Sequence, residues 1–354
     1  MKIGKIEMTS VMITLICMKL FLTFPRELLS SAGNGAWLSG IFITVVAVVI
    51  FYITGKIYRT NKTVIDIAYE TGGKWFKRIT GIVLFGIIGF NLTFTLRIFP
   101  ETVRIILLHN TPMTIIITLL CIAIAIGTYN GIESLARIIS FFLPVAAVVL
   151  SLFIILLVPH FNSKNIAPIL GKGLNAIFTD SFKGIALFTD LIILNLLLPL
   201  CKNKDEAFKS GIKAIFISGI TLTVILVALG LVYPRQFSES FIMPVYQLTR
   251  LVSIGDFFSR VEAFFEFLWS IAMFLYTSVY IYVLCYIWKE TFDLKFYKPL
   301  AAPIVAICAA VSYMSDSLMN TINLYSQSFL YIYVITSALP VVFGIIERIQ
   351  QDKL

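Results

Sequence analysis

Two ionisable side chains lie in the middle of long apolar runs of this sequence. Lys19 is the twelfth residue of the run 8–31, and Asp190 is the eleventh residue of the run 180–200. A charge inside a bilayer costs about 3 kcal/mol or more, so such residues usually pair with each other or serve a ligand or ion. We expect Asp190 to pair with Lys19 or to bind a cationic ligand. For Lys19 the alternatives are a cavity-lining role, an extension to the membrane surface, or a structural contact within the bundle.

Six further polar residues could line a site around this pair: Thr23, Thr189, Asn195, Asn91, Glu262 and Tyr276. Threonine hydroxyls in membrane helices often bond only to their own helix backbone, which is the structural alternative for both threonines. Asn91 could clamp two helices together instead of binding a ligand. Glu262 shares a helix face with Glu266 and suits a gate or a partner contact, and Tyr276 could donate its hydroxyl to a cavity.

A second group of charges follows in the run 79–108. Arg97, Glu101 and Arg104 are spaced i, i+4, i+7, so they share one face of a helix. We interpret them as a mutually paired structural network.

Nothing in the sequence is typical of a metal centre or an enzyme. The five cysteines, at positions 17, 121, 201, 285 and 308, are scattered without a CxxC pair, and the two histidines lie far apart. There is no paired-histidine, nucleophile-elbow or phosphate-loop pattern. We therefore predict neither a metal nor a cofactor, and no enzymatic activity.

The elements that must position the polar residues are membrane helices. Of the 354 residues, 59% are hydrophobic and only 13% are charged, whereas a soluble protein has roughly 45–50% apolar and about 25% charged residues. This composition excludes a soluble enzyme, an outer-membrane barrel, a disordered chain and a sizeable extramembrane domain. It predicts an all-α polytopic membrane protein with a single transmembrane domain over residues 1–354.

Ten apolar runs are long enough to be spanning helices. They cover residues 8–31, 36–55, 79–108, 112–130, 134–158, 180–200, 211–232, 261–288, 299–315 and 324–346. Lys19 interrupts the first run, and we read that run as a retained helix rather than a signal peptide. Ten helices divide into half-repeats of five, at about 8–158 and 180–346, and an odd number inverts the second half relative to the first. This organisation is typical of an inverted-repeat transporter.

Cationic residues gather in alternate loops. The loop after the second run carries Lys56, Arg59, Lys62, Lys74, Lys77 and Arg78, the loop after the sixth carries four lysines, and the loop after the eighth carries three. By the positive-inside rule these loops are cytoplasmic, and so are both termini. The net charge of +9 is thus accounted for by topology, and we predict a lipid bilayer and no nucleic acid as a partner.

Local breaks are expected at a few places. Pro25 follows Lys19 and should interrupt the first helix, since proline removes a backbone hydrogen bond and clashes with the preceding turn. The run 180–200 has no glycine or proline at its centre, so the sequence gives no sign of a break there. The outer segments 159–179 and 233–257 mix apolar and polar residues and predict short helices along the membrane surface.

Several motifs resemble one known family. They are AGNGAWLSG (32–40), HNTP (109–112), GIESLARIISFFLP (131–144), NIAPILGKG (165–173) and, most of all, PVYQLTRLVSIGDFFSRVEAFFEFLW (244–269). Together with the Pro25 break they are similar to the GerAB-type spore germination permeases, of the amino acid–polyamine–organocation superfamily. The resemblance extends over nearly the whole chain.

This resemblance implies a ten-helix, LeuT-like 5+5 inverted-repeat fold that holds a ligand where helices one and six are broken. It further implies a receptor subunit that binds a small nutrient germinant, such as an amino acid or a similar metabolite. The implied partners are an A-type membrane subunit and a C-type lipoprotein subunit in the inner spore membrane. The alternative is a secondary amino acid transporter, and the sequence alone does not separate the two.

Overall fold

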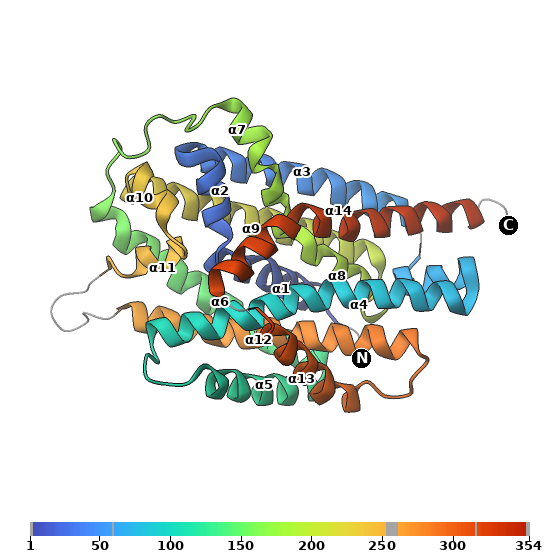
Figure 1. The fold of residues 1–354 in the computed structure, drawn as a ribbon. Coiled ribbons are helices and arrows are strands. Elements are labelled where there is room, and N and C mark those ends of the chain that lie inside the picture. Colours follow the sequence, from blue (N-terminus) through green and yellow to red (C-terminus); the bar gives the residue numbers. More distant parts are fainter. Residues whose placement is uncertain (1–2, 59, 253–260, 316, 352–354) are drawn as a thin grey trace.

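The computed structural model describes residues 3–58, 60–252, 261–315 and 317–351 as a bundle of helices (Figure 1). Arg59 of the first cationic loop and residues 253–260 of the 244–269 motif lie outside the described residues. Within the described ranges the only β contact is an isolated parallel bridge between Ile3 and Cys201. The all-α prediction is confirmed.

The α-helices are α1 (Lys5–Cys17), α2 (Phe24–Ala32), α3 (Ala36–Ile57), α4 (Val64–Ile106), α5 (Met113–Tyr129), α6 (Ile132–Leu157), α7 (Leu174–Phe178), α8 (Leu191–Leu196), α9 (Lys204–Val232), α10 (Arg235–Ser240), α11 (Pro244–Thr249), α12 (Val261–Thr291), α13 (Ala301–Ser312) and α14 (Leu318–Gln351). Short 3₁₀ helices connect some of them: η1 (Met18–Phe21), η2 (Gly33–Gly35), η3 (Val158–His160), η4 (Asp180–Asp190), η5 (Leu198–Leu200) and η6 (Lys298–Leu300).

Six helical segments of the described chain are long and apolar enough to cross a membrane: Phe24–Ile57, Val64–Ile106, Ile132–His160, Lys204–Val232, Glu262–Thr291 and Leu330–Gln350. Helices α5 and α13 are apolar but shorter, and they pack against α4 and α12 (Figure 1). The first and sixth apolar runs are broken into pieces. Every predicted run therefore contains helix, while the count of ten membrane crossings stays a prediction.

The first run is interrupted in the way that its proline suggests. Helix α1 ends at Cys17, and η1 carries Lys19; Leu22 then leaves helical geometry, with φ −82° and ψ −126°. Pro25 lies in the first turn of α2, where a missing N–H leaves no helical bond unmade. The break opens the backbone just after Lys19.

The sixth run is also interrupted, although its sequence gives no sign of it. Residues Asp180–Asp190 form the 3₁₀ helix η4, which passes into the six-residue helix α8 and then η5. A 3₁₀ run of eleven residues is unusual, because side chains three apart eclipse and the hydrogen bonds are less well aligned. Contacts of η4 with α2, α3 and α14 hold this segment in place.

Helix α4 bends near its N-terminal end. Gly72 and Gly73 are non-helical, and Gly73 has φ +66°, a conformation that favours glycine. Residues 64–71 therefore form a separate first segment within a region that the sequence suggested was a loop. Thr63 caps this segment by accepting a bond from Asp66 N.

The outer segments form short helices as predicted, but only in part. They contain α7, α10 and α11, while 161–173 is largely without regular structure. Asn34 Nδ2 donates to the carbonyls of Asn165 and Ala167, and Lys172 N donates to Ala32 O. The segment 162–173 thus packs over the turn between α2 and α3, and we call it the outer strap.

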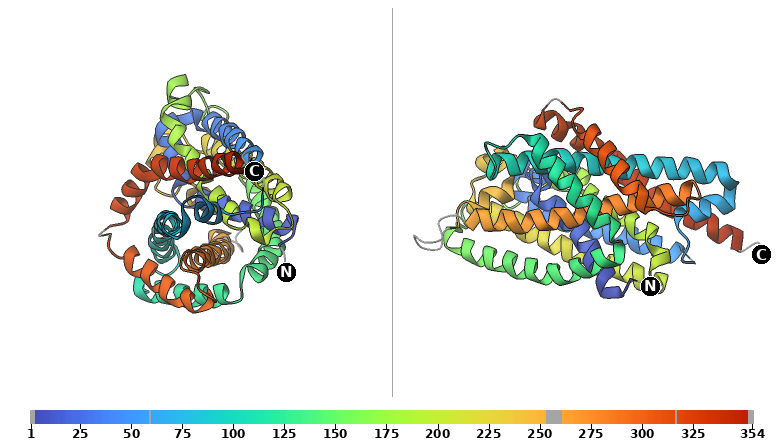
Figure 2. Two further views of the ribbon diagram at one scale, coloured as in Figure 1. Left: turned by 90° about the vertical axis from the view of Figure 1, so that its right-hand side faces the viewer. Right: turned by 90° about the horizontal axis from the view of Figure 1, so that it is seen from below.

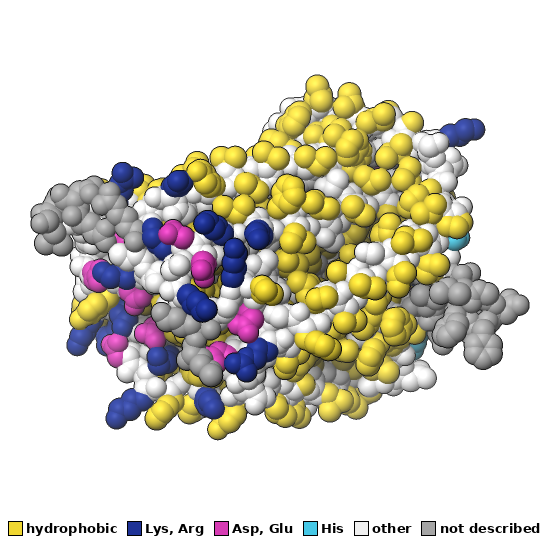
Figure 3. All heavy atoms as spheres, turned by 180° about the vertical axis from the view of Figure 1, so that it is seen from behind, with side chains coloured by type: hydrophobic (Ala, Val, Ile, Leu, Met, Phe, Trp, Pro, Cys, Tyr) yellow, Lys and Arg dark blue, Asp and Glu magenta, His cyan; other side chains and the backbone are white. Residues whose placement is uncertain are grey.

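Charge is distributed unevenly along the bundle. Both termini lie toward the same end (Figures 1 and 2). The space-filling view shows lysine and arginine side chains gathered at that end, and hydrophobic side chains over most of the remaining face (Figure 3). We call this the cationic end, and the opposite one the outer end.

Candidate functional site

The centre of the bundle holds a buried ion pair between the two broken segments. Lys19 Nζ lies 2.9 Å from Asp190 Oδ2, and their side chains are 6% and 1% exposed. Lys19 Nζ also donates to Thr189 Oγ1 at 3.0 Å and lies 3.5 Å from Ala186 O. Lys19 does not extend to the membrane surface, so its contacts are internal.

A tyrosine hydroxyl binds the second oxygen of the Asp190 carboxylate. The Tyr280 hydroxyl donates to Asp190 Oδ1, and its ring lies 4.7 Å from that of Tyr276. Tyr276 was predicted from the sequence, whereas Tyr280 was not. The spacing could have indicated Tyr280, because it lies one turn further along the same face of α12.

A small cavity adjoins the pair. It is lined by Lys19, Leu22, Thr23, Phe24, Phe94, Thr95, Ala186 and Tyr325. The volume in which the centre of a water molecule fits is about 10 Å³, so the cavity has room for about one water. We call it the central cavity; in this conformation it is too small for an amino acid.

The other predicted residues lie at different depths. Asn91 Oδ1 accepts a bond from the Tyr325 hydroxyl at 2.8 Å, next to the central cavity, so Asn91 clamps α4 to α14. Asn195 Oδ1 accepts from Val64 N at 3.0 Å, nearer the cationic end. Glu262 is half-buried at the outer start of α12 and is not among the residues that line the central cavity.

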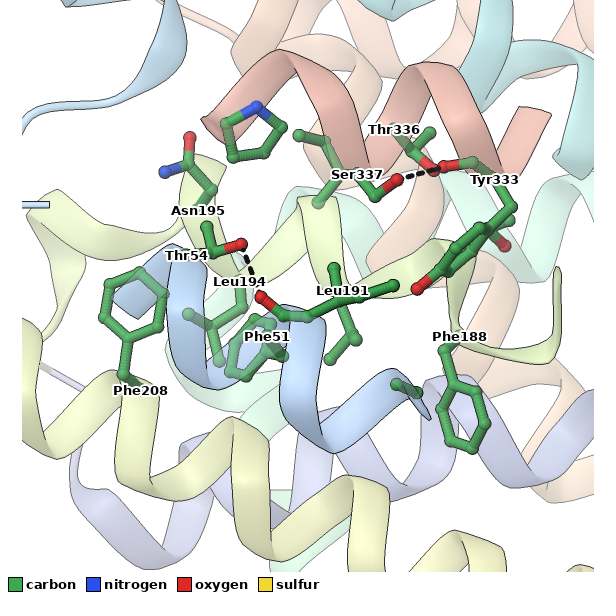
Figure 4. A pocket seen from close by; sticks show the side chains of 15 residues that line it. Phe51, Thr54, Phe188, Leu191, Leu194, Asn195, Phe208, Tyr333, Thr336 and Ser337 are labelled. Atoms are coloured by element: carbon green, nitrogen blue, oxygen red, sulfur yellow. Dashed lines mark hydrogen bonds between the residues drawn. The ribbon is translucent and has the colours of Figure 1, made fainter. Parts of the chain in front are cut away.

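A second cavity lies on the cationic side of the pair. Figure 4 shows the side chains that line it. Thr54, Thr189, Asn195, Thr336 and Ser337 contribute polar groups to its wall, and its volume is about 30 Å³. The amide Nδ2 of Asn195 is buried here. Because Thr189 both lines this inner cavity and bonds to Lys19, it lies between the inner cavity and the ion pair.

Contacts close the bundle on both sides of the pair. On the outer side, the Phe94 and Tyr325 rings stack with centroids 3.4 Å apart, and Ser326 Oγ donates to Glu27 Oε2 at 2.7 Å. On the cationic side, the Thr60 hydroxyl donates to Glu347, and Lys204 Nζ donates to Tyr58 O at 2.6 Å. The central cavity is therefore occluded.

The network on the outer part of α4 is paired, as the sequence predicted. Arg97 Nη1 lies 3.5 Å from Glu101 Oε2, and Arg104 Nη2 lies 2.7 Å from Glu101 Oε1. Two cations thus share one carboxylate.

A family model described as spore germination protein matches residues 2–321. The chain belongs to this spore germination family. Spore germination protein A2 of Bacillus subtilis is 26% identical over 339 residues, which cover 93% of this chain and 91% of that protein. Spore germination protein KB of the same organism is 24% identical over 266 residues, covering 72% of this chain and 69% of that protein.

Solved structures show that this spore germination protein has a LeuT-type transporter fold. Mhp1, a nucleobase-cation-symport-1 family transporter in a closed conformation with bromovinylhydantoin bound, superposes with a TM-score of 0.71 at 13% identity. The match covers 95% of this chain and 77% of Mhp1. A manganese transporter of Eremococcus coleocola gives a TM-score of 0.62 at 10% identity, over 96% of this chain and 78% of the transporter. The family and the fold are those of multi-pass membrane permeases, not of enzymes.

Proposed function

We propose that this spore germination protein is a receptor subunit that binds a small nutrient germinant, an amino acid or a similar metabolite, between the two broken helices. The observation that carries the proposal is the buried Lys19–Asp190 pair, 2.9 Å apart beside the occluded central cavity. A zwitterionic ligand offers the same two charges. Its ammonium group would bind Asp190, and its carboxylate would bind Lys19, in place of the internal ion pair.

This exchange makes binding and conformation depend on each other. The central cavity has room for about one water, so a ligand must bind a more open conformation. Such a ligand shifts the population toward that conformation by its differential affinity. Signalling then needs only a partner that senses the change.

The proposed partners are an A-type membrane subunit and a C-type lipoprotein subunit, in the inner spore membrane. The similarity to spore germination proteins A2, KB and B2 of Bacillus subtilis supports this assignment. The cationic end supports an orientation with both termini in the cytoplasm.

Secondary transport of amino acids is the second candidate. The transporter fold favours it, as does the inner cavity that lies beyond Thr189 on the cationic side of the pair. Transport would carry the ligand past the pair into that cavity, whereas a pure receptor would return it to the outer side.

The test uses spores that contain the complete receptor, with a mixture of the twenty common amino acids as the germinant. Asp190→Asn should raise the concentration needed for half-maximal germination by at least about tenfold, since it removes the charge that binds the ammonium group. Asp180→Asn is the matched control, because Asp180 begins the same element η4 and is exposed. Equal responses of the two variants, at equal protein levels, would contradict the proposed site.

Two further experiments separate the candidates. Deletion of the A-type or C-type partner should abolish germination if the chain acts as a receptor subunit. Proteoliposomes that contain only this chain should accumulate labelled amino acids if it is a transporter, and should not if it only senses them.

A further inference from the structure

A larger cavity lies on the outer side of the central cavity, between α4, the C-terminal end of α13 and the N-terminal part of α14. Its volume, counted as before, is about 400 Å³. The α4 wall consists of Phe90, Thr93, Phe94 and Arg97, whose i, i+3, i+4, i+7 spacing places them on one helix face. We call it the outer cavity.

One aromatic side chain separates the outer cavity from the central one. Phe94 lines both cavities and stacks on Tyr325, which lines the central cavity. Tyr325 is held in turn by its bond to Asn91. A molecule in the outer cavity is therefore one stacked pair away from Lys19.

Arg97 is incompletely paired. Its side chain is 11% exposed, and its Nη1 donates to the neutral Met113 Sδ at 3.1 Å. Its one ion-pair contact is with Glu101 at 3.5 Å, which Arg104 approaches more closely at 2.7 Å. The Nε of Arg97 is buried and has no hydrogen-bond partner among the described residues. Two arginines and one glutamate on α4 leave one positive charge uncompensated within that group.

The chemistry of the wall indicates what such a charge could bind. A guanidinium group binds a carboxylate through two parallel hydrogen bonds. The Thr93 and Ser312 hydroxyls donate to backbone carbonyls, so their oxygens remain able to accept bonds from a donor group of a ligand. Phe90, Val311 and Leu324 add apolar surface, which suits an organic acid better than inorganic phosphate.

We propose that the outer cavity is a recognition site for the carboxylate group of a small molecule, with Arg97 as its anchor. This inference rests on the proposed function in one respect only, namely that a ligand continues inward past Phe94 to the central cavity. Binding at Arg97 can be measured without it.

The experiment measures the melting temperature of the full-length chain in nanodiscs made of phosphatidylcholine alone, which carries no carboxylate. Propionate is the probe, and propionamide is its neutral isostere. Propionate should raise the melting temperature of the wild type, and propionamide should not. No effect of propionate, or an effect that needs an anionic lipid, would overturn the proposal.

Variants locate the binding. Arg97→Gln should raise the propionate concentration for a half-maximal shift by at least about tenfold, equivalent to about 1.4 kcal/mol. Arg104→Gln is the matched control, because it removes the same charge from the same glutamate, while its side chain is 41% exposed and does not line the cavity. Equal weakening by both substitutions would mean that only the general charge matters, against the proposal.

Two more variants keep the test decisive. The double change Lys19→Met with Asp190→Asn should leave the propionate effect intact; its loss there, with retention in Arg97→Gln, would place the binding in the central cavity instead. If Arg97→Gln is not recovered folded, Arg97→Lys replaces it. Lysine keeps the charge without the two-pronged geometry, so it should weaken propionate binding and still prefer propionate to propionamide.

Discussion

The Lys19–Asp190 pair should show strong energetic coupling in a double-mutant cycle. The two charges lie 2.9 Å apart, and at an effective dielectric constant of about 20 their attraction is roughly 6 kcal/mol before the cost of desolvation. Removal of one member of a buried pair typically costs about 3–5 kcal/mol, because the remaining charge is stranded. We expect Lys19→Met and Asp190→Asn each to lower the free energy of unfolding by that amount.

The double variant should be less destabilised than the sum of the two single variants. It contains no unpaired charge, so the coupling free energy should be about 2–3 kcal/mol. Some loss remains even so, since Thr189 Oγ1 and the Tyr280 hydroxyl each lose a charged partner. The assay is the free energy of unfolding in bicelles, measured for the wild type, both single variants and the double variant.

A parallel cycle supplies the control. Asp180→Asn and Lys183→Met are the same substitutions on the same element η4, at two exposed positions. They should each change the free energy of unfolding by no more than about 0.5 kcal/mol and should be additive. If the Lys19 and Asp190 effects are also additive within about 0.5 kcal/mol, the two side chains do not form the pair described above.

Three further predictions concern topology, packing and the turn after α12. Cysteine at Ser163, which is exposed in the outer strap, should react with an impermeant maleimide on intact cells, whereas cysteine at Lys202 should react only after permeabilisation; the reverse pattern would refute the orientation. Gly219→Ala should lower the melting temperature, at a cost of about 1–3 kcal/mol, because its Cβ would lie 2.2 Å from Thr44 Cγ2; the control Gly86→Ala, with nothing within 4 Å, should not. The hydrogen bond from Lys77 lowers the pKa of the exposed Asp293 carboxyl, so this pair persists at neutral pH and is lost only as the pH falls through that lowered pKa. Since Asp293 also has φ +54°, Asp293→Ala should lower the melting temperature more than Asp293→Asn, which tolerates that φ; equal effects would leave no role for backbone strain.

The contacts that close the outer side of the bundle join α2 to its neighbours. Glu27 ties α2 to α14 on the outer side, and the Asn34 and Lys172 bonds tie the turn after α2 to the outer strap. Helix α14 thus carries both Tyr325 of the stacked pair and Ser326, which donates to Glu27. The outer part of α2 is thus connected mechanically to both the central cavity and the outer surface.

The sequence by itself determined the class of protein and the position of its central charges. Composition excludes folding in water, and the apolar runs contain the helices because a bilayer forces each segment to satisfy its own backbone. The spacing of Arg97, Glu101 and Arg104 predicted their pairing, since i, i+3 and i+4 neighbours are fixed by helix geometry alone. Pro25 likewise predicted a break, because its effect on a helix is local.

Only the tertiary structure decided what surrounds those charges. Tyr280, Tyr325 and Phe94 come from helices far apart in the sequence, and no local pattern says which face of each helix meets the others. One glycine, Gly184, lies within η4, and a single glycine does not predict an eleven-residue 3₁₀ helix; contacts with α2, α3 and α14 hold that geometry instead. Asn195 is close to Asp190 in the sequence but bonds to Val64 N in the cationic half, because five helical residues make about 1.4 turns and rise about 7.5 Å, which carries it away from the pair.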